Sequence, residues 1–548
     1  MGDLAHDLLE PGVELEETHI SWVFLTARDV YKVKKPIDLG FLDFTTVQAR
    51  RAACDAEVQL NRRLAPDVYL GVLPITAGAD GRHRIGGVGH TVDWAVHMRR
   101  LPAASRGDHL LADGLLSRRH LTRVADRLAA FHDQARCDST TASFGSPESI
   151  GRNVRENFRQ TRDSIASYLV EEEAAEIERW QLGFLERARE LFLERARLGR
   201  IRDGHGDLRL EHLYLLEDGQ GASAAAADRP SSRDGGGLEQ GAAEPAIAIA
   251  IIDCIEFNER FRYADVCADV AFLSMDLARH GHVDLAEHFL ARYARAANDY
   301  DLYPLIDFYQ SYRAYVRGKV ASLLAADRGA APGVGARAAA DARLHFKLAL
   351  ASERPSLLPP MVIAVGGPIA SGKSATAEWI ADQRSAPIVD SDRTRKALLG
   401  VAPNERVWHA PFRGGYAPDV TAEVYAEVLR RAAAVLTSGR AVVLDASFRS
   451  REERAAARRL AAEHGVGFLF VECAADRATL HARLEKRARR AAVSDGRIEI
   501  LDDFLASWEP VTELAPDQHV RLDTTRPHEQ NRDLLRSRIA FWPPRLSG

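Results

Sequence analysis

The string GPIASGKS, residues 367–374, limits the possible folds of this chain more than any other stretch. It fills the pattern G-x-x-x-x-G-K-[ST] with Gly367, Gly372, Lys373 and Ser374. The glycines let the backbone curl until successive N–H groups point at a phosphate. Lys373 would then reach the β- and γ-phosphate oxygens, and Ser374 would ligate Mg²⁺. A nucleotide site for ATP with Mg²⁺ is therefore expected here, between a buried strand and a helix.

Apolar runs alternate with helical patterns through this C-terminal part of the chain. Strands are predicted at residues 361–367, 386–390, 441–446, 467–473 and 519–523. Such alternation implies a parallel sheet with helices on both faces. The Pro-rich string SERPSLLPP (352–360) precedes it as a domain boundary. We therefore predict a three-layer α/β/α P-loop domain over residues 356–548.

Two aspartates that follow strands in this part are candidates for the chemistry. Asp445 ends the strand 441–446, where a carboxylate can hold Mg²⁺ through water; the alternative is an ordinary turn residue. Asp392 follows the second strand, where it would face the γ-phosphate and deprotonate an acceptor hydroxyl; the alternative is a helix N-cap. Arg395, one helical turn further on, would hold the acceptor or its phosphate.

An arginine-rich helical string, HARLEKRARR, occupies residues 481–490. Helical spacing puts Arg483, Arg487 and Arg490 on one face. Such a helix can close over the nucleotide as a lid, where its arginines neutralise charge in the transition state. The alternative is a solvated basic face.

These features together resemble the P-loop kinases of the gluconate kinase, polynucleotide kinase and zeta-toxin type, over about residues 361–545. The resemblance rests on GPIASGKS, the D-x-x-R pair Asp392–Arg395, VVLDASF and the arginine-rich helix. It implies that Asp392 activates the acceptor hydroxyl and that Arg483 and Arg487 act from the lid. The acceptor itself differs among these families, so the resemblance does not identify it.

A second phosphate-handling pattern, HGDLRLEHLYL, lies at residues 205–215. In kinase-like loops of the form H-x-D-x-x-x-x-N, the aspartate is the base and the asparagine a metal ligand. Asp207 takes the first position, and Asp253 of the later string IIDCIEFNE would bind the metal. His212 replaces the asparagine and suits Mg²⁺ poorly. It would ligate Mn²⁺, act through a water or hold the loop by hydrogen bonding.

Upstream residues supply the other parts that such a site needs. A hairpin is predicted over 20–35, a helix over 46–64, and strands at 68–76 and 92–101. Lys32 and Lys34 face the same way on the hairpin's second strand. Lys32 is favoured as the nucleotide lysine because apolar Val30 precedes it by two residues. Glu57 on the helix would be its ion-pair partner.

The order of these motifs resembles the aminoglycoside phosphotransferase-like family over about residues 15–350, through HGDL, IIDCIEFN and LAAFHDQA. The two halves together resemble bacterial fusions of such a domain with a P-loop ATPase/kinase domain. This implies a bilobal protein-kinase-like fold over residues 1–355, with long helices predicted at 117–198 and 264–351. Residues 219–245 have low complexity and are expected to be a disordered insertion at a hairpin tip.

The sequence thus favours a two-domain protein of the α/β and α+β classes. The expected activity is a phosphotransferase that moves the ATP γ-phosphate to a hydroxyl of a small polar acceptor, such as a sugar or sugar derivative. GTP is an alternative donor. A polynucleotide 5′-hydroxyl kinase is a second hypothesis, although the net charge of −5 does not favour nucleic acid. A third makes the N-terminal half a nucleotide-sensing regulator. No signal or membrane segment is apparent, so a cytoplasmic protein is expected.

Overall fold

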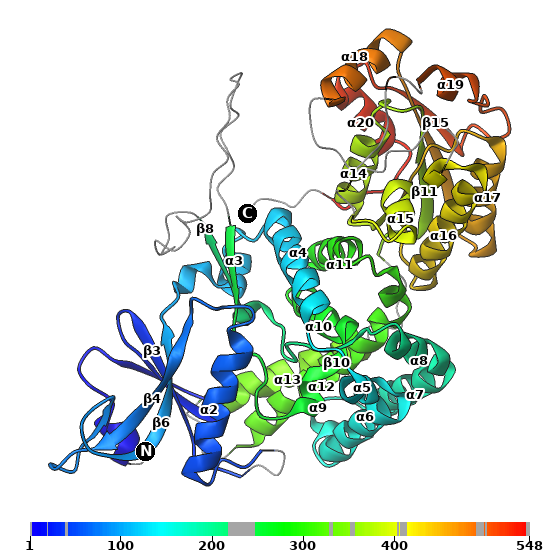
Figure 1. The fold of residues 1–548 in the computed structure, drawn as a ribbon. Helices are drawn as coiled ribbons and strands as arrows, with labels where there is room; N and C mark the ends of the chain where they lie inside the picture. The colour runs from blue at the N-terminus through cyan, green and yellow to red at the C-terminus, as the bar shows by residue number, and fades with distance from the viewer. Residues whose placement is uncertain are drawn as a thin grey trace. The chain divides into compact units, whose positions relative to one another are not determined.

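The computed structural model describes residues 3–18, 20–38, 42–217, 247–327, 333–350, 357–402, 405, 414–488, 498 and 501–543. The chain divides into two compact units (Figure 1). Unit 1 comprises Met1–His280 and Tyr312–Lys347; unit 2 comprises Gly281–Ser311 and Leu348–Gly548. The units are therefore not two consecutive stretches, and Gly281–Ser311 joins the P-loop unit. The expected division of domains at residue 355 stays a prediction.

Unit 1 begins with an antiparallel six-stranded sheet in the order β1-β2-β3-β6-β4-β5. Its strands are β1 (Glu14–Glu17), β2 (Ser21–Leu25), β3 (Asp29–Lys34), β4 (Tyr69–Ala77), β5 (His83–Ile85) and β6 (His90–Arg99). The pairing of β2 with β3 confirms the predicted hairpin. Helix α2 (Val47–Asn61) begins where the Thr46 side chain accepts a hydrogen bond from the Ala49 N–H. It packs on the sheet through Cys54 and Val58.

The rest of unit 1 is mainly helical. Strands β8 (Leu213–Glu217) and β9 (Ile247–Ile251) pair antiparallel, which confirms strands on both sides of the predicted insertion. The insertion, 219–245, lies outside the described residues. Strand β7 (Ile201–Asp203) pairs with β10 (Tyr263–Asp265). The helices that lie wholly in this unit are α1 (Asp3–Asp7), α3 (Gly107–Ala112), α4 (Arg118–Gln134), α5 (Ser139–Ala142), α6 (Pro147–Thr161), α7 (Glu171–Arg187), α8 (Arg189–Arg197), α9 (Glu259–Arg262) and α10 (Val266–Arg279). Helices α12 (Tyr303–Ala326) and α13 (Val334–Leu350) belong partly to unit 1 and partly to unit 2.

Unit 2 contains a five-stranded parallel sheet in the order β12-β13-β11-β14-β15. The strands are β11 (Met361–Gly366), β12 (Ile388–Asp390), β13 (Val442–Asp445), β14 (Gly467–Ala474) and β15 (His519–Asp523). All five predicted strands and their parallel arrangement are confirmed. The carboxyl ends of β11 and β13 lie side by side, so the phosphate loop and Asp445 share one edge of the sheet.

Helices cover both faces of this sheet (Figure 1). One face packs against α14 (Lys373–Arg384) and α20 (His528–Arg536) through Ile380, Leu535 and strand residues such as Val365. The other helices of the unit are α11 (Val283–Ala296), α15 (Ser391–Leu398), α16 (Pro418–Thr437), α17 (Arg451–Glu463), α18 (Arg477–Ala488) and α19 (Leu501–Ala506), with the 3₁₀ turn η6 at Tyr300–Leu302. Within the described residues, every helix is too short or too polar to cross a membrane.

Candidate functional sites

The phosphate loop connects β11 to α14 and has the curled backbone that its glycines permit. Gly367 has φ 144° and Gly372 has φ 92°. A Cβ on Gly367 would lie 2.3 Å from the Cys473 carbonyl oxygen, so no other residue fits there. Ala370 also has a positive φ, 62°. Helix α14 starts at Lys373, and no described side chain caps its N-terminus, so its first N–H groups lack partners within the helix. This geometry suits an anion at the helix N-terminus.

Asp445 at the end of β13 is buried beside this loop. Its carboxylate lies within hydrogen-bonding reach of the Ser374 hydroxyl and interacts electrostatically with Lys373. Within the described residues, its Oδ1 has no hydrogen-bond partner. Burial raises the pKa of Asp445 to about 6, and Lys373 only partly opposes this. A buried carboxylate oxygen without a partner, next to a serine hydroxyl, fits the hard oxygen ligands that Mg²⁺ prefers.

The carboxyl end of β12 carries the second acidic group. Asp390 caps α15, because its Oδ1 accepts a hydrogen bond from the Arg393 N–H at 2.7 Å. The alternative reading of Asp392 as the helix N-cap is therefore wrong. Asp392 instead lies in the first turn of α15, half-exposed. The guanidinium of Arg395, one turn on, lies 4.6 Å from the ring centre of Tyr416.

The arginine-rich helix is α18, which confirms a helix over 481–488; residues 489 and 490 lie outside the described residues. Arg483 donates to the Ala370 carbonyl at 3.2 Å and to the Thr524 carbonyl at 2.7 Å. The Thr524 hydroxyl in turn donates to the Ser371 carbonyl at 2.7 Å. Arg483 thus connects α18 to the phosphate loop through the Ala370 carbonyl. The Arg487 side chain lies outside the described residues. Sequence reasoning missed Thr524, which carries no motif.

In unit 1, both hairpin lysines enter one charged cluster. Lys32 Nζ lies 2.5 Å from Asp253 Oδ1 and 3.0 Å from Glu57 Oε1, as expected for the favoured lysine. Lys34 Nζ lies 2.5 Å from Glu57 Oε2 and also pairs with Glu256. Lys34, Glu57 and Glu256 have almost no exposed side-chain surface, whereas the Asp253 side chain is 43 % exposed. Two lysines thus face three carboxylates. Of these five side chains, Asp253 alone has a large solvent-exposed fraction.

The electrostatics of this cluster favour its charged form. Burial opposes the charge on Lys32, but Asp253 and Glu57 outweigh it and raise the pKa of the lysine. Burial likewise opposes ionisation of Asp253, and Lys32 and His212 outweigh it and lower the pKa of the carboxyl. Glu256 differs, because burial raises its pKa despite the charge of Lys34. Lys32 and Asp253 therefore form the firmly ionised part of the cluster.

The loop that starts at His205 brings three predicted residues together. Arg209 donates to both carboxylate oxygens of Asp207 over 3.1–3.3 Å. Burial would raise the pKa of Asp207, but Arg209 and His212 lower it below its ordinary value. His212 Nδ1 lies 2.7 Å from the Asp207 carbonyl oxygen, which can only accept, so Nδ1 carries the proton. The other ring nitrogen, Nε2, lies 3.6 Å from Asp253 Oδ2 and 3.5 Å from Glu211 Oε1.

Helix α10 holds this loop with two buried aspartates that sequence reasoning missed. Asp269 accepts hydrogen bonds from the His205 N–H at 2.6 Å and the Gly206 N–H at 2.8 Å. Asp276 accepts one from the Leu210 N–H at 2.9 Å. The two aspartates are seven residues apart, so they lie on one face of the helix. That spacing, within the apolar string VCADVAFLSMDLAR, was the available signal.

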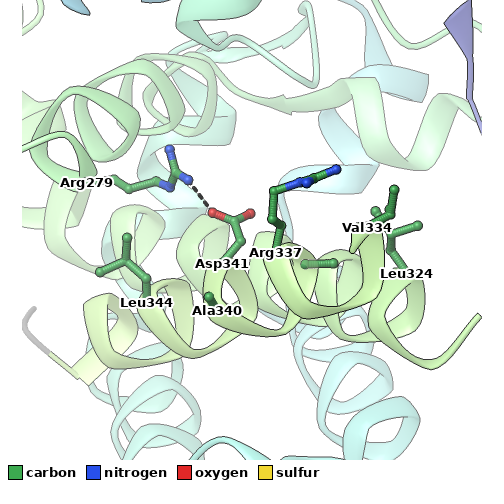
Figure 2. Close-up of a pocket in the computed structure, with 8 residues that line it drawn as sticks. Arg279, Leu324, Val334, Arg337, Ala340, Asp341 and Leu344 are labelled. Atoms are coloured by element: carbon green, nitrogen blue, oxygen red, sulfur yellow. Dashed lines mark hydrogen bonds and ion pairs between the residues drawn. The ribbon is translucent and has the colours of Figure 1, made fainter. Parts of the chain in front are cut away.

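A hollow of about 560 Å³ in unit 1 is lined mainly by α13, together with Arg279 of α10 and Leu324 of α12 (Figure 2). Arg279 and Asp341 form an ion pair at its side. It is lined by Arg279, Leu324, Val334, Arg337, Ala338, Ala340, Asp341 and Leu344. None of the candidate site residues belongs to this lining, so the hollow is not part of either site.

Residues 362–511 match the family model described as "AAA domain", which covers the phosphate loop, Asp392 and Asp445. Together with the parallel sheet, this match establishes a P-loop fold for the C-terminal part of the chain. Two solved structures are similar to about a third of the chain. A putative kinase from Chloroflexus aurantiacus has 19% identity and a TM-score of 0.27, covering 33% of this chain and 100% of that one. A gluconokinase from Sinorhizobium meliloti has 22% identity and a TM-score of 0.24, covering 32% and 88%.

A likeness over nearly the whole length exists to the protein Rv2004c of Mycobacterium tuberculosis. The two chains are 31% identical over 527 residues, which is 95% of this chain and 94% of the relative. Both the P-loop part and the part that carries the His205 loop fall within so long a match. The protein therefore belongs to the same family as Rv2004c of Mycobacterium tuberculosis.

Proposed function

We propose that the P-loop unit transfers the γ-phosphate of ATP to a hydroxyl of a small polar acceptor, such as a sugar or sugar derivative. The observation that carries this proposal is the buried Asp445 carboxylate beside Lys373 and Ser374, at the mouth of the phosphate loop. A buried carboxylate with one oxygen that lacks a hydrogen-bond partner is costly unless a further cation joins it. A nucleotide phosphate with its metal ion supplies such a cation.

Ser374 and Asp445 would hold the Mg²⁺ that accompanies ATP. The ion would screen the charge of the phosphates during transfer. Lys373, the first residue of α14, adds a positive charge on the phosphate side. Arg483 keeps the loop in its curled form through the Ala370 carbonyl.

Asp392 is the proposed base in this reaction. It lies in the first turn of α15, two residues after the end of β12, at the same sheet edge as Asp445. From there its carboxylate would accept the proton of the acceptor hydroxyl as the oxygen attacks the phosphate. Arg395 and Arg487 are proposed to bind the acceptor and to neutralise charge in the transition state, respectively.

The proposal is tested by phosphate transfer from labelled ATP, or GTP, to a panel of sugars and to a 5′-OH oligonucleotide. Lys373→Ala and Asp392→Asn should each abolish transfer, whereas Asp517→Asn, at an exposed position far along the chain, should not. Transfer to the oligonucleotide alone would select the polynucleotide kinase alternative. Transfer that survives both Lys373→Ala and Asp392→Asn would refute the proposed site.

A second nucleotide site in unit 1 is proposed because Lys32 contacts both Glu57 and Asp253. In a protein-kinase-like, aminoglycoside phosphotransferase-like fold, Lys32 would bind the phosphates and Asp253 the metal. His212 supports this because the hydrogen bond of its Nδ1 to the Asp207 carbonyl holds the ring with Nε2 3.6 Å from Asp253 Oδ2. Asp207 would be the base, although its pairing with Arg209 makes it a weak one.

Counting bound nucleotides separates the two sites. Equilibrium dialysis with ATP and Mg²⁺ should find two nucleotides per chain, one after Lys373→Ala, and none after Lys373→Ala with Lys32→Met. If Asp207→Asn left phosphate transfer unchanged while the nucleotide still bound in unit 1, this half would be a sensor rather than a second catalyst. One nucleotide per native chain would contradict the second site.

A further inference from the structure

The sheet of unit 2 ends at β12, which is only three residues long. An edge strand leaves backbone groups without a partner strand. Here the segment Gly281–Ser311, which precedes the phosphate loop by more than fifty residues, contacts β12 through α11 and Tyr300. The Tyr300 hydroxyl donates a hydrogen bond of 2.5 Å to the Ile388 carbonyl, in place of a neighbouring strand. Tyr300 and Asp390 are both buried.

Arg295 in α11 reaches the same strand end. Its guanidinium pairs with Glu378 of α14, and its Nη2 lies 3.5 Å from Asp390 Oδ2. The other oxygen of Asp390, Oδ1, caps α15 by accepting from the Arg393 N–H. One carboxylate thus links Arg295 to the helix that carries Asp392 and Arg395. Within the described residues, Oδ2 has no hydrogen bond, so Arg295 is the nearest counter-charge from outside α15.

Several charged contacts fix the segment to the rest of the unit. Arg430 donates to Asp301 at 2.7 Å, and Arg431 to Asn298 at 2.8 Å. The contacts of Arg440 are with Glu287 at 2.7 Å and Asp307 at 3.0 Å. The segment is therefore held along its length, and not only at Arg295.

We propose that Arg295 and Tyr300 are positioning residues of the phosphotransfer site. They hold the end of β12 and the Asp390 cap, and so set the orientation of α15 and of Asp392 on it. This inference rests on the proposed function of the P-loop unit. It adds that the working unit includes Gly281–Ser311 and is incomplete in a fragment that begins at residue 357.

The test uses the full chain with Arg295→Met, Arg295→Lys and the matched control Arg292→Met. Arg292 lies on the same helix and pairs with Glu378 and Asp382, but has no contact with Asp390 among those that the structure records. Hydrogen exchange of the α15 amides reports the cap without requiring any activity. Phosphate release from ATP that depends on Lys373 reports the site.

Arg295→Met should speed exchange in α15 about fivefold or more, because the cap loses its counter-charge. Turnover should fall about tenfold, with the KM for ATP within about twofold, since the phosphate loop lies on another strand. Arg295→Lys should restore most of both, and Arg292→Met should change neither. Unchanged exchange in α15 after Arg295→Met, or an equal change after Arg292→Met, overturns the inference. Absence of any Lys373-dependent phosphate release refutes the proposed function instead, while the exchange result still decides the role of Arg295.

Discussion

Replacing Asp445 by asparagine should stabilise unit 2 at neutral pH, against the usual effect of changing a buried residue. Burial raises the pKa of Asp445 from 3.8 to about 6. Above pH 6 the Asp445 carboxyl is therefore ionised in the folded protein, although burial makes its ionisation less favourable there than in the unfolded chain. A shift of about two pKa units corresponds to ~3 kcal/mol of lost stability when the group is fully ionised.

The pH dependence gives the sign of this effect. Between pH 4 and pH 6 the folded state binds more protons than the unfolded state, so lowering the pH removes the penalty. Asp445→Asn should thus be more stable than the native chain by ~3 kcal/mol at pH 7.5 and by only ~1 kcal/mol at pH 4.5. Asparagine keeps the size and polarity of the side chain, so packing changes little.

The slowest amides of β11 report unfolding of this unit in hydrogen exchange, at the two pH values. The exposed Asp517→Asn serves as the control and should change the unfolding free energy by less than about 0.5 kcal/mol at either pH. Addition of Mg²⁺ with ADP should stabilise the native chain far more than Asp445→Asn. A variant that is no more stable than the native chain at pH 7.5, with no change at pH 4.5, would refute the reasoning.

Three further changes test unit 1. Lys34→Met should lower the unfolding free energy by about 3–5 kcal/mol because it leaves Glu57 and Glu256 short of positive charge; urea unfolding should show a smaller loss when Glu256→Gln is added. Asp269→Asn should cost about 1–3 kcal/mol, read from faster amide exchange at His205 and Gly206, because a carboxylate that accepts two N–H groups is lost. His212→Asn should strengthen nucleotide binding with Mg²⁺ more than with Mn²⁺ in a Lys373→Ala background, because an amide oxygen suits Mg²⁺ better than imidazole; equal effects with the two metals would contradict a place for His212 beside the metal.

The sequence alone was sufficient for most of the P-loop fold. The strands of unit 2 are short runs of buried apolar residues separated by helices, and this alternation leaves a parallel sheet as the main solution. The phosphate loop was equally clear, because Gly367 and Gly372 both adopt backbone angles that the motif requires. Lys32 and Glu57 were paired correctly from their order along the chain.

The wrong or missing predictions concern residues for which several local structures are equally favourable and tertiary contacts decide which one forms. In VDSD, residues 389–392, three side chains can cap a helix, and the point where β12 ends selects Asp390. The apolar Val30 favours Lys32 over Lys34, and no local pattern indicates that Lys34 also pairs with Glu57. The contacts of Arg295 could not be predicted, since Glu378 and Asp390 are distant in sequence and share no motif with it.

Each of the two units is built from two separate stretches of the chain, and this limits how such a protein can form by gene fusion and where it can be divided. The chain passes from one unit to the other after His280, after Ser311 and after Lys347. Joining two finished genes end to end creates only one such passage. A recombination event or a cloning boundary placed in the Pro-rich string 352–360 would leave the P-loop unit without its own Gly281–Ser311. Exchange of the C-terminal part between relatives should therefore succeed only when that earlier segment is exchanged with it.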